Sequence, residues 1–130
     1  MKFATILILQ FLSFVSIAQD KIDYNALQNE IKSLSNEKKW EHIVLKAESY
    51  RISSPSTGLE LMAWAEKQAF FENRYTSGYL IRKADLLKNV GKQDEALKTF
   101  DEAFIKAKKD NDTLNMAGIL FKLSDTYSEL

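Results

Sequence analysis

Three short segments of the chain follow one pattern: a small residue, an acidic residue, any residue and a large apolar residue. They are "LKAESY" at 45–50, "RKADLL" at 82–87 and "KLSDTY" at 122–127. Their small residues, Ala47, Ala84 and Ser124, recur at nearly equal intervals. Self-similarity at a period of about 38 residues is typical of architectures that stack one structural unit on the next. We therefore expect this chain to be built from repeated units.

The segment 94–107, "DEALKTFDEAFIKA", keeps one helical face alternately small and bulky. Ala96 and Ala103 are small, and Phe100 lies between them. In a helical hairpin, small residues allow the helices to approach closely, and a bulky side chain fills the hole beside them. A similar arrangement occurs one period earlier, at Gly58, Met62, Ala65 and Ala69. The unit is thus a pair of helices, used about two and a half times.

The spacing of apolar residues after residue 20 is helical almost throughout, and helix formers dominate the composition. Ser54 before Pro55 is typical of a helix start, and Gly91 can take the left-handed conformation that ends a helix. We expect an all-α chain with helices near 22–34, 37–52, 55–72, 75–89, 93–109 and 113–130.

The unit that starts at Ser77 resembles the tetratricopeptide repeat (TPR). The residues that match the family pattern are Leu80, Ala84, Leu87, Gly91, Ala96, Phe100 and Ala103. Lys83 stands where the family has a leucine, and the period exceeds the family's basic repeat of about 34 residues. The resemblance implies a right-handed solenoid of antiparallel helical hairpins over residues 19–130.

The last expected helix corresponds to the first helix of a hairpin, and no partner helix follows it within the 130 residues. We therefore expect the repeat domain to be truncated at its C-terminus. Leu120, Leu123 and Tyr127 would then form an apolar outer face, because each unit of a solenoid is stabilised mainly by its neighbours. The alternative is that this helix is itself a modest terminal cap.

Longer units of this kind are similar to the exported N-terminal repeat regions of bacterial TPR-containing sensor histidine kinases and helix-turn-helix regulators. The resemblance implies non-catalytic recognition of a protein or peptide, as the sensory or scaffold segment of a bacterial signalling protein. Two alternatives stay open. In the first, the chain is a structural spacer or oligomerisation element. In the second, it is a fragment of a sensor histidine kinase whose catalytic domain lies outside this sequence.

The resemblance also implies a binding groove lined by the first helix of each unit. The family's groove positions fall on Val44, Glu48 and Arg51; on Ile81, Asp85 and Lys88; and on Phe121, Asp125 and Ser128. These positions form an apolar column, an acidic column and a partly basic column, which together suit a peptide. The alternative is that Glu48–Arg51 and Asp85–Lys88 are ordinary solvated pairs within one helix.

The N-terminus has the layout of a secretory signal peptide. Lys2 precedes an apolar run to Ala18, and the small residues Ser16 and Ala18 suit cleavage before Gln19. We expect residues 1–18 to be removed and residues 19–130 to act in the periplasm or outside the cell. A membrane contact would then require a retained N-terminal anchor or a segment beyond this sequence.

Composition argues against several classes of function. Lys and Arg total 18, as do Asp and Glu, so the formal net charge is zero and nucleic acid is an unsuitable partner. The chain has no cysteine and one histidine, His42, whose surroundings lack a kinase phosphoacceptor motif. No pair of acids accompanies a nucleophile or a glycine-rich turn, so we expect no enzyme activity, no cofactor and no metal. Trp40 and Trp64 are candidates for ligand stacking or for packing.

Overall fold

The structure, a computed structural model, describes residues 21–130, which form six α-helices, one short 3-10 helix and no strand. Their bounds are α2 (Tyr24–Ile31), α3 (Asn36–Ser49), α4 (Pro55–Glu66), η1 (Ala69–Phe71), α5 (Ser77–Asn89), α6 (Gln93–Lys109) and α7 (Thr113–Ser128). The expectation of an all-α chain is confirmed. Residues 1–20, which hold the predicted signal segment and cleavage point, lie outside the described residues.

Local capping explains most helix ends. The hydroxyl of Thr76 accepts a hydrogen bond from the backbone N–H of Tyr79 at the start of α5, and the carboxylate of Asp112 accepts one from Asn115 at the start of α7. Gly91 follows α5 with φ of +85°, so the predicted left-handed stop is confirmed.

The start and end of α4 differ from expectation in two details. Ser54 makes no side-chain cap, because its hydroxyl lies 2.6 Å from the hydroxyl of Thr57 instead. The helix ends at Glu66 rather than near residue 72, and η1 follows it. Ending the helix here lets the next two rings pack on different neighbours. Phe70 lies against Trp64, with ring centroids 6.2 Å apart, and Phe71 lies against Tyr79, at 5.0 Å.

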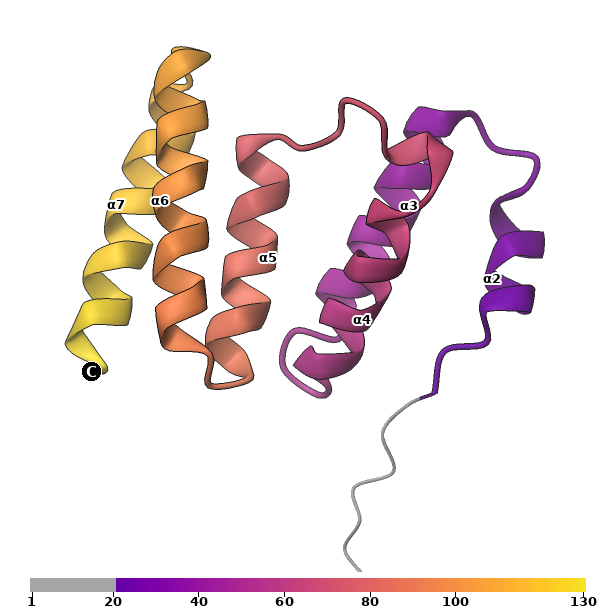
Figure 1. The fold of residues 1–130 in the computed structure, drawn as a ribbon, viewed down its shortest axis with the longest axis horizontal. Coiled ribbons are helices and arrows are strands. Elements are labelled where there is room, and N and C mark those ends of the chain that lie inside the picture. The colour runs from indigo at the N-terminus through magenta and orange to yellow at the C-terminus, as the bar shows by residue number, and fades with distance from the viewer. Residues whose placement is uncertain (1–20) are drawn as a thin grey trace, which may run out of the picture.

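Each helix from α3 to α7 lies beside the next one along the chain, and α5 also contacts both α3 and α7 (Figure 1). Helices that open successive sequence repeats are therefore neighbours in space. Among the helices of residues 21–130, none combines the length and the apolar character that a bilayer crossing requires. The expectation that the repeat domain is truncated stays a prediction.

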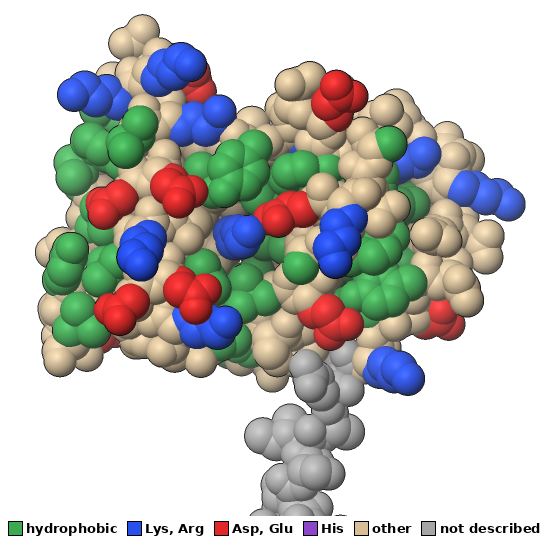
Figure 2. Space-filling model, viewed as in Figure 1, with side chains coloured by type: hydrophobic (Ala, Val, Ile, Leu, Met, Phe, Trp, Pro, Cys, Tyr) green, Lys and Arg blue, Asp and Glu red, His purple; other side chains and the backbone are tan. Residues whose placement is uncertain are grey.

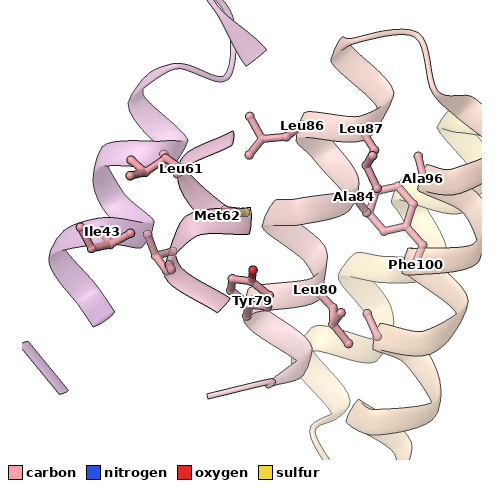
Figure 3. Close-up of a cluster of buried hydrophobic side chains, with 14 of the residues drawn as sticks. Ile43, Leu61, Met62, Tyr79, Leu80, Ala84, Leu86, Leu87, Ala96 and Phe100 are labelled. Carbon is pink, nitrogen blue, oxygen red and sulfur yellow. The ribbon is translucent and has the colours of Figure 1, made fainter. Parts of the chain in front are cut away.

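Helix α5 uses two different faces to hold the helices on either side of it (Figure 3). Tyr79 and Leu86 point toward α4, whereas Leu80, Ala84 and Leu87 point toward Ala96 and Phe100 of α6. All of these side chains are buried, and Ala84, Ala96 and Phe100 have no exposed area. The alternation of small and bulky residues in 94–107 is therefore a packing pattern, as predicted.

Candidate functional site

The apolar column of the predicted groove runs from buried to exposed across α3, α5 and α7. Val44 is 4% exposed and belongs to the core, Ile81 is half-buried, and Phe121 is 76% exposed. The three residues therefore do not present one continuous apolar strip. Val44 reaches the surface only as one wall of a hollow described below.

The acidic column does lie on neighbouring helices, and each carboxylate there contacts a basic side chain of the adjacent first helix. Glu48 lies 3.0 Å from the Arg82 Nε, Asp85 lies 2.7 Å from the Lys122 Nζ, and Asp125 lies 2.5 Å from the Lys88 Nζ. These ion pairs join α3 to α5 and α5 to α7. The alternative of solvated pairs within one helix, Glu48–Arg51 and Asp85–Lys88, is thus replaced by pairing between helices.

Lys88 pairs with two carboxylates, one within α7 and one on the residue that follows it. Its Nζ lies 2.5 Å from Asp125 and 3.0 Å from Glu129, and its side chain is 16% exposed. The hydrogen bond to Asp125, followed by that to Glu129, raises the pKa of Lys88 above its ordinary value. The adjacent Asn89 donates from its amide to the carbonyl oxygen of Arg51 at 2.8 Å. Of the partly basic column, therefore, Lys88 joins α5 to α7 through its side chain, whereas Arg51 takes part through its carbonyl oxygen alone.

A hollow of about 250 Å³ lies where α3 meets α5. Its lining residues are Trp40, Glu41, Val44, Leu45 and Arg82. Leu45 is 61% exposed, and the indole Nε1 of Trp40 is buried without a hydrogen-bond partner among residues 21–130. The hollow thus combines apolar walls with the guanidinium of Arg82, whereas the Trp40 N–H is itself buried.

Sequence reasoning about the groove found Val44 but missed Leu45 and Arg82. Three consecutive apolar residues, Ile43, Val44 and Leu45, span about 200° around a helix, which is wider than one core face, so this run was an available signal for one exposed side chain. Arg82 could have been found from its position nearly one repeat period after Glu48.

The other candidate side chains have structural contacts. The ring of Trp64 lies 5.3 Å from that of Tyr24 and 6.2 Å from that of Phe70, which assigns it to packing between α2 and α4. His42 Nε2 lies 2.8 Å from Glu30, whose pKa is lowered mainly by a hydrogen bond from Lys46. No group of three His, Asp or Glu side chains in residues 21–130 is arranged to hold a metal ion.

Charges of both signs are mixed over the face shown in Figure 2, with hydrophobic side chains between them. No large area of a single sign occurs on this face. No protein-family model, no curated protein and no solved structure matches the chain.

Proposed function

We propose that the chain is a non-catalytic module of the TPR type that binds a protein or peptide. In this proposal the module is the exported sensory or scaffold segment of a bacterial signalling protein. The observation that carries peptide binding is the hollow between α3 and α5, where the exposed Leu45 lies beside Arg82.

A regular set of contacts between successive units supports the repeat architecture. Polar contacts join residues that are 34 to 38 positions apart, close to the period of the sequence pattern. The pairs are Glu48–Arg82, Asp85–Lys122, Lys88–Asp125, Arg51–Asn89 and Ser77–Asn115. Such a series is what stacked units of about 38 residues would produce, because each unit contacts the next in a similar register.

The size of the hollow favours a peptide side chain over a small metabolite. Its volume of about 250 Å³ lies below the roughly 300–1,000 Å³ typical of small-molecule sites. Val44, Leu45 and the Trp40 ring would hold a large apolar side chain. The Arg82 guanidinium would donate to a neighbouring carbonyl or carboxylate of the same peptide.

Random-peptide phage display against residues 19–130 tests this proposal. Enriched peptides should share a large apolar residue next to an acidic residue or the C-terminal carboxylate. Leu45→Asp should weaken binding of a selected peptide at least about tenfold, because it places an unpaired charge against the apolar wall. Ile105→Asp is the matched control: Ile105 is 68% exposed, lies on α6 and does not line this hollow.

The ion pairs between first helices specifically favour the alternative of a structural spacer, because they hold neighbouring units in one register without any ligand. A spacer would enrich no peptide family in the same selection. Equal binding by the wild type and by the Leu45→Asp variant would place recognition elsewhere on the chain. A fragment of a sensor kinase stays compatible with the peptide proposal and is tested by an autophosphorylation assay of the complete gene product.

A further inference from the structure

Helix α7 corresponds to α5 one repeat later, but only one of its two faces is covered. The counterparts of Tyr79 and Leu86 are Ile119 and Thr126, and both are fully buried on the side of α6. The counterparts of Leu80, Ala84 and Leu87 are Leu120, Ser124 and Tyr127, and all three are exposed. In α5 this second face packs on a further helix, whereas in α7 it is open.

The open face, which we define as Leu114, Ala117, Leu120, Phe121, Ser124 and Tyr127, is strongly apolar. Its large side chains are 83% exposed at Leu114, 55% at Leu120, 76% at Phe121 and 59% at Tyr127. Contiguous apolar patches of this kind mark interaction surfaces in soluble proteins. Hydrophobic side chains also reach the edge of the molecule on the side where α6 and α7 lie (Figure 2).

Large and small side chains follow the same order along the open face from either end of the helix. Large residues stand at 114, at 120 and 121, and at 127, and small residues stand at 117 and 124. Two copies of such a helix can pair antiparallel about a two-fold axis near residues 120 and 121. Ala117 of one copy then lies level with Ser124 of the other, which allows close approach. Leu120 of one copy lies level with Phe121 of the other, so large side chains meet at the centre.

We propose that the open face of α7 binds the same face of a second copy of this chain. This inference does not depend on peptide binding in the hollow between α3 and α5. An isologous interface requires a surface that is complementary to itself, and the two-directional order of large and small residues supplies that complementarity.

The charges near the open face do not oppose such a pair. Asp125 is already paired with Lys88, and Lys122 is already paired with Asp85. Without Lys2, residues 19–130 keep 17 of the 18 Lys and Arg beside 18 Asp and Glu, so two copies repel each other only weakly overall. Like charges therefore do not meet uncompensated across the two-fold axis.

The apolar area of the open face is that of a weak dimer, whose population rises with protein concentration. A buried aromatic side chain removes about 150–250 Å² from water, so Phe121 and Tyr127 together offer roughly 200–340 Å² per copy at their exposures of 76% and 59%. Leu114 and Leu120 add to this area. The sum stays below the roughly 800 Å² per partner of standard stable interfaces.

Disulfide trapping tests both the occupant and the register, because the natural chain has no cysteine. Mixing the Ala117→Cys variant with the Ser124→Cys variant should give a covalent dimer that contains one copy of each. Neither variant alone should form it, because identical positions would lie about 10 Å apart along the helix, beyond the roughly 4.4–6.8 Å Cα separation of a disulfide. A dimer from Ala117→Cys alone, or none from the mixture, would overturn the proposal.

Sedimentation equilibrium of residues 19–130 from about 1 μM to about 1 mM provides an independent test. Wild type should dimerise, and the Ala117→Glu/Ser124→Glu variant should weaken association at least about tenfold, because four carboxylates would meet across the axis. The Leu45→Asp variant should dimerise like the wild type even though it loses peptide. A monomer at every concentration would overturn the proposal and favour instead the missing partner helix of a truncated repeat as the occupant of the open face.

Discussion

Gly58 in α4 lies so close to the backbone of α3 that a Cβ atom there would be 2.7 Å from the carbonyl oxygen of Ala47. The same Cβ would lie 2.8 Å from a methyl group of Leu86 in α5. Three helices therefore meet at this buried residue. The interpretation of Gly58 as a site of close contact is confirmed, and the contact explains why glycine takes the place of Ala96 in the earlier unit.

We expect Gly58→Ala to destabilise the fold by about 1–3 kcal/mol through overpacking, which outweighs the gain of about 1 kcal/mol in helix propensity. Gly118→Ala is the matched control. Gly118 is also within a helix, and a Cβ there meets nothing within 4 Å, so this change should stabilise by about 0.5–1 kcal/mol. Urea unfolding followed by circular dichroism measures both. A gain in stability at both positions would contradict the close-contact interpretation.

Ala96→Leu should also destabilise the fold by about 1–3 kcal/mol. Ala96 has no exposed area and faces Leu87 between α5 and α6 (Figure 3), so a larger side chain has no free volume to occupy. Ala63→Leu, on the exposed side of α4, is the control and should leave the melting temperature nearly unchanged. Equal melting of the two variants would show that Ala96 does not face α5.

Asp85 and Lys122 should be energetically coupled. Their side chains, 18% and 35% exposed, lie 2.7 Å apart and join α5 to α7. A double-mutant cycle with Asp85→Asn and Lys122→Met should give a coupling energy of about 0.5–1 kcal/mol that decreases as sodium chloride is added. A value of zero at low salt would show that this pair makes no contribution to the α5–α7 contact.

Helix positions were the most predictable part of the fold, because the spacing of apolar residues and the capping residues are local signals. The helix expected near 93–109 is observed as Gln93–Lys109. The buried small residues Ala47, Ala84, Ala96 and Ala103 were predicted for the same reason. Leu123 was predicted to face outward on the last helix but is half-buried against the core, because it lies on the side of α7 that faces α6.

Contacts between distant residues were less predictable. The partners of Glu48 and Asp85 lie on the next first helix, and sequence spacing alone could not distinguish them from neighbours one turn on in the same helix. The hollow depends on how α3 and α5 are oriented, so its lining by Leu45 and Arg82 became visible only in three dimensions.

The N-terminal prediction is tested on the exported protein. Ser16 and Ala18 after the apolar run predict cleavage before Gln19, since small residues suit the −3 and −1 positions of a signal peptide. Intact-mass spectrometry of the secreted or periplasmic fraction should find a chain without residues 1–18. Recovery of a chain that starts at Met1 from the membrane fraction would indicate a retained anchor.

The fold should lose stability at alkaline pH through Tyr79. Its ring has no exposed area, and its hydroxyl donates a 2.6 Å hydrogen bond to Glu66. Burial, followed by the hydrogen bond to Glu66, raises the pKa of Tyr79 far above the value of about 10 for an unfolded chain. The folded state therefore holds this proton more tightly than the unfolded state does.

Because the folded-state pKa is the higher one, the contribution of Tyr79 is complete below about pH 10 and is lost progressively as the pH rises above it. Each pH unit beyond that point should cost about 1.4 kcal/mol for this one group. Tyr24 adds to the same loss, because burial and its hydrogen bond to Glu60 raise its pKa to about 12.

Tyr79→Phe should therefore reduce the slope of unfolding free energy against pH between about pH 10 and 12. The variant keeps Glu66 partnered, since Lys83 lies 2.6 Å from it. Urea unfolding across this range measures the slope, with the lysines common to both proteins as an internal control. An unchanged slope would show that Tyr79 is not the group whose ionisation opens the fold.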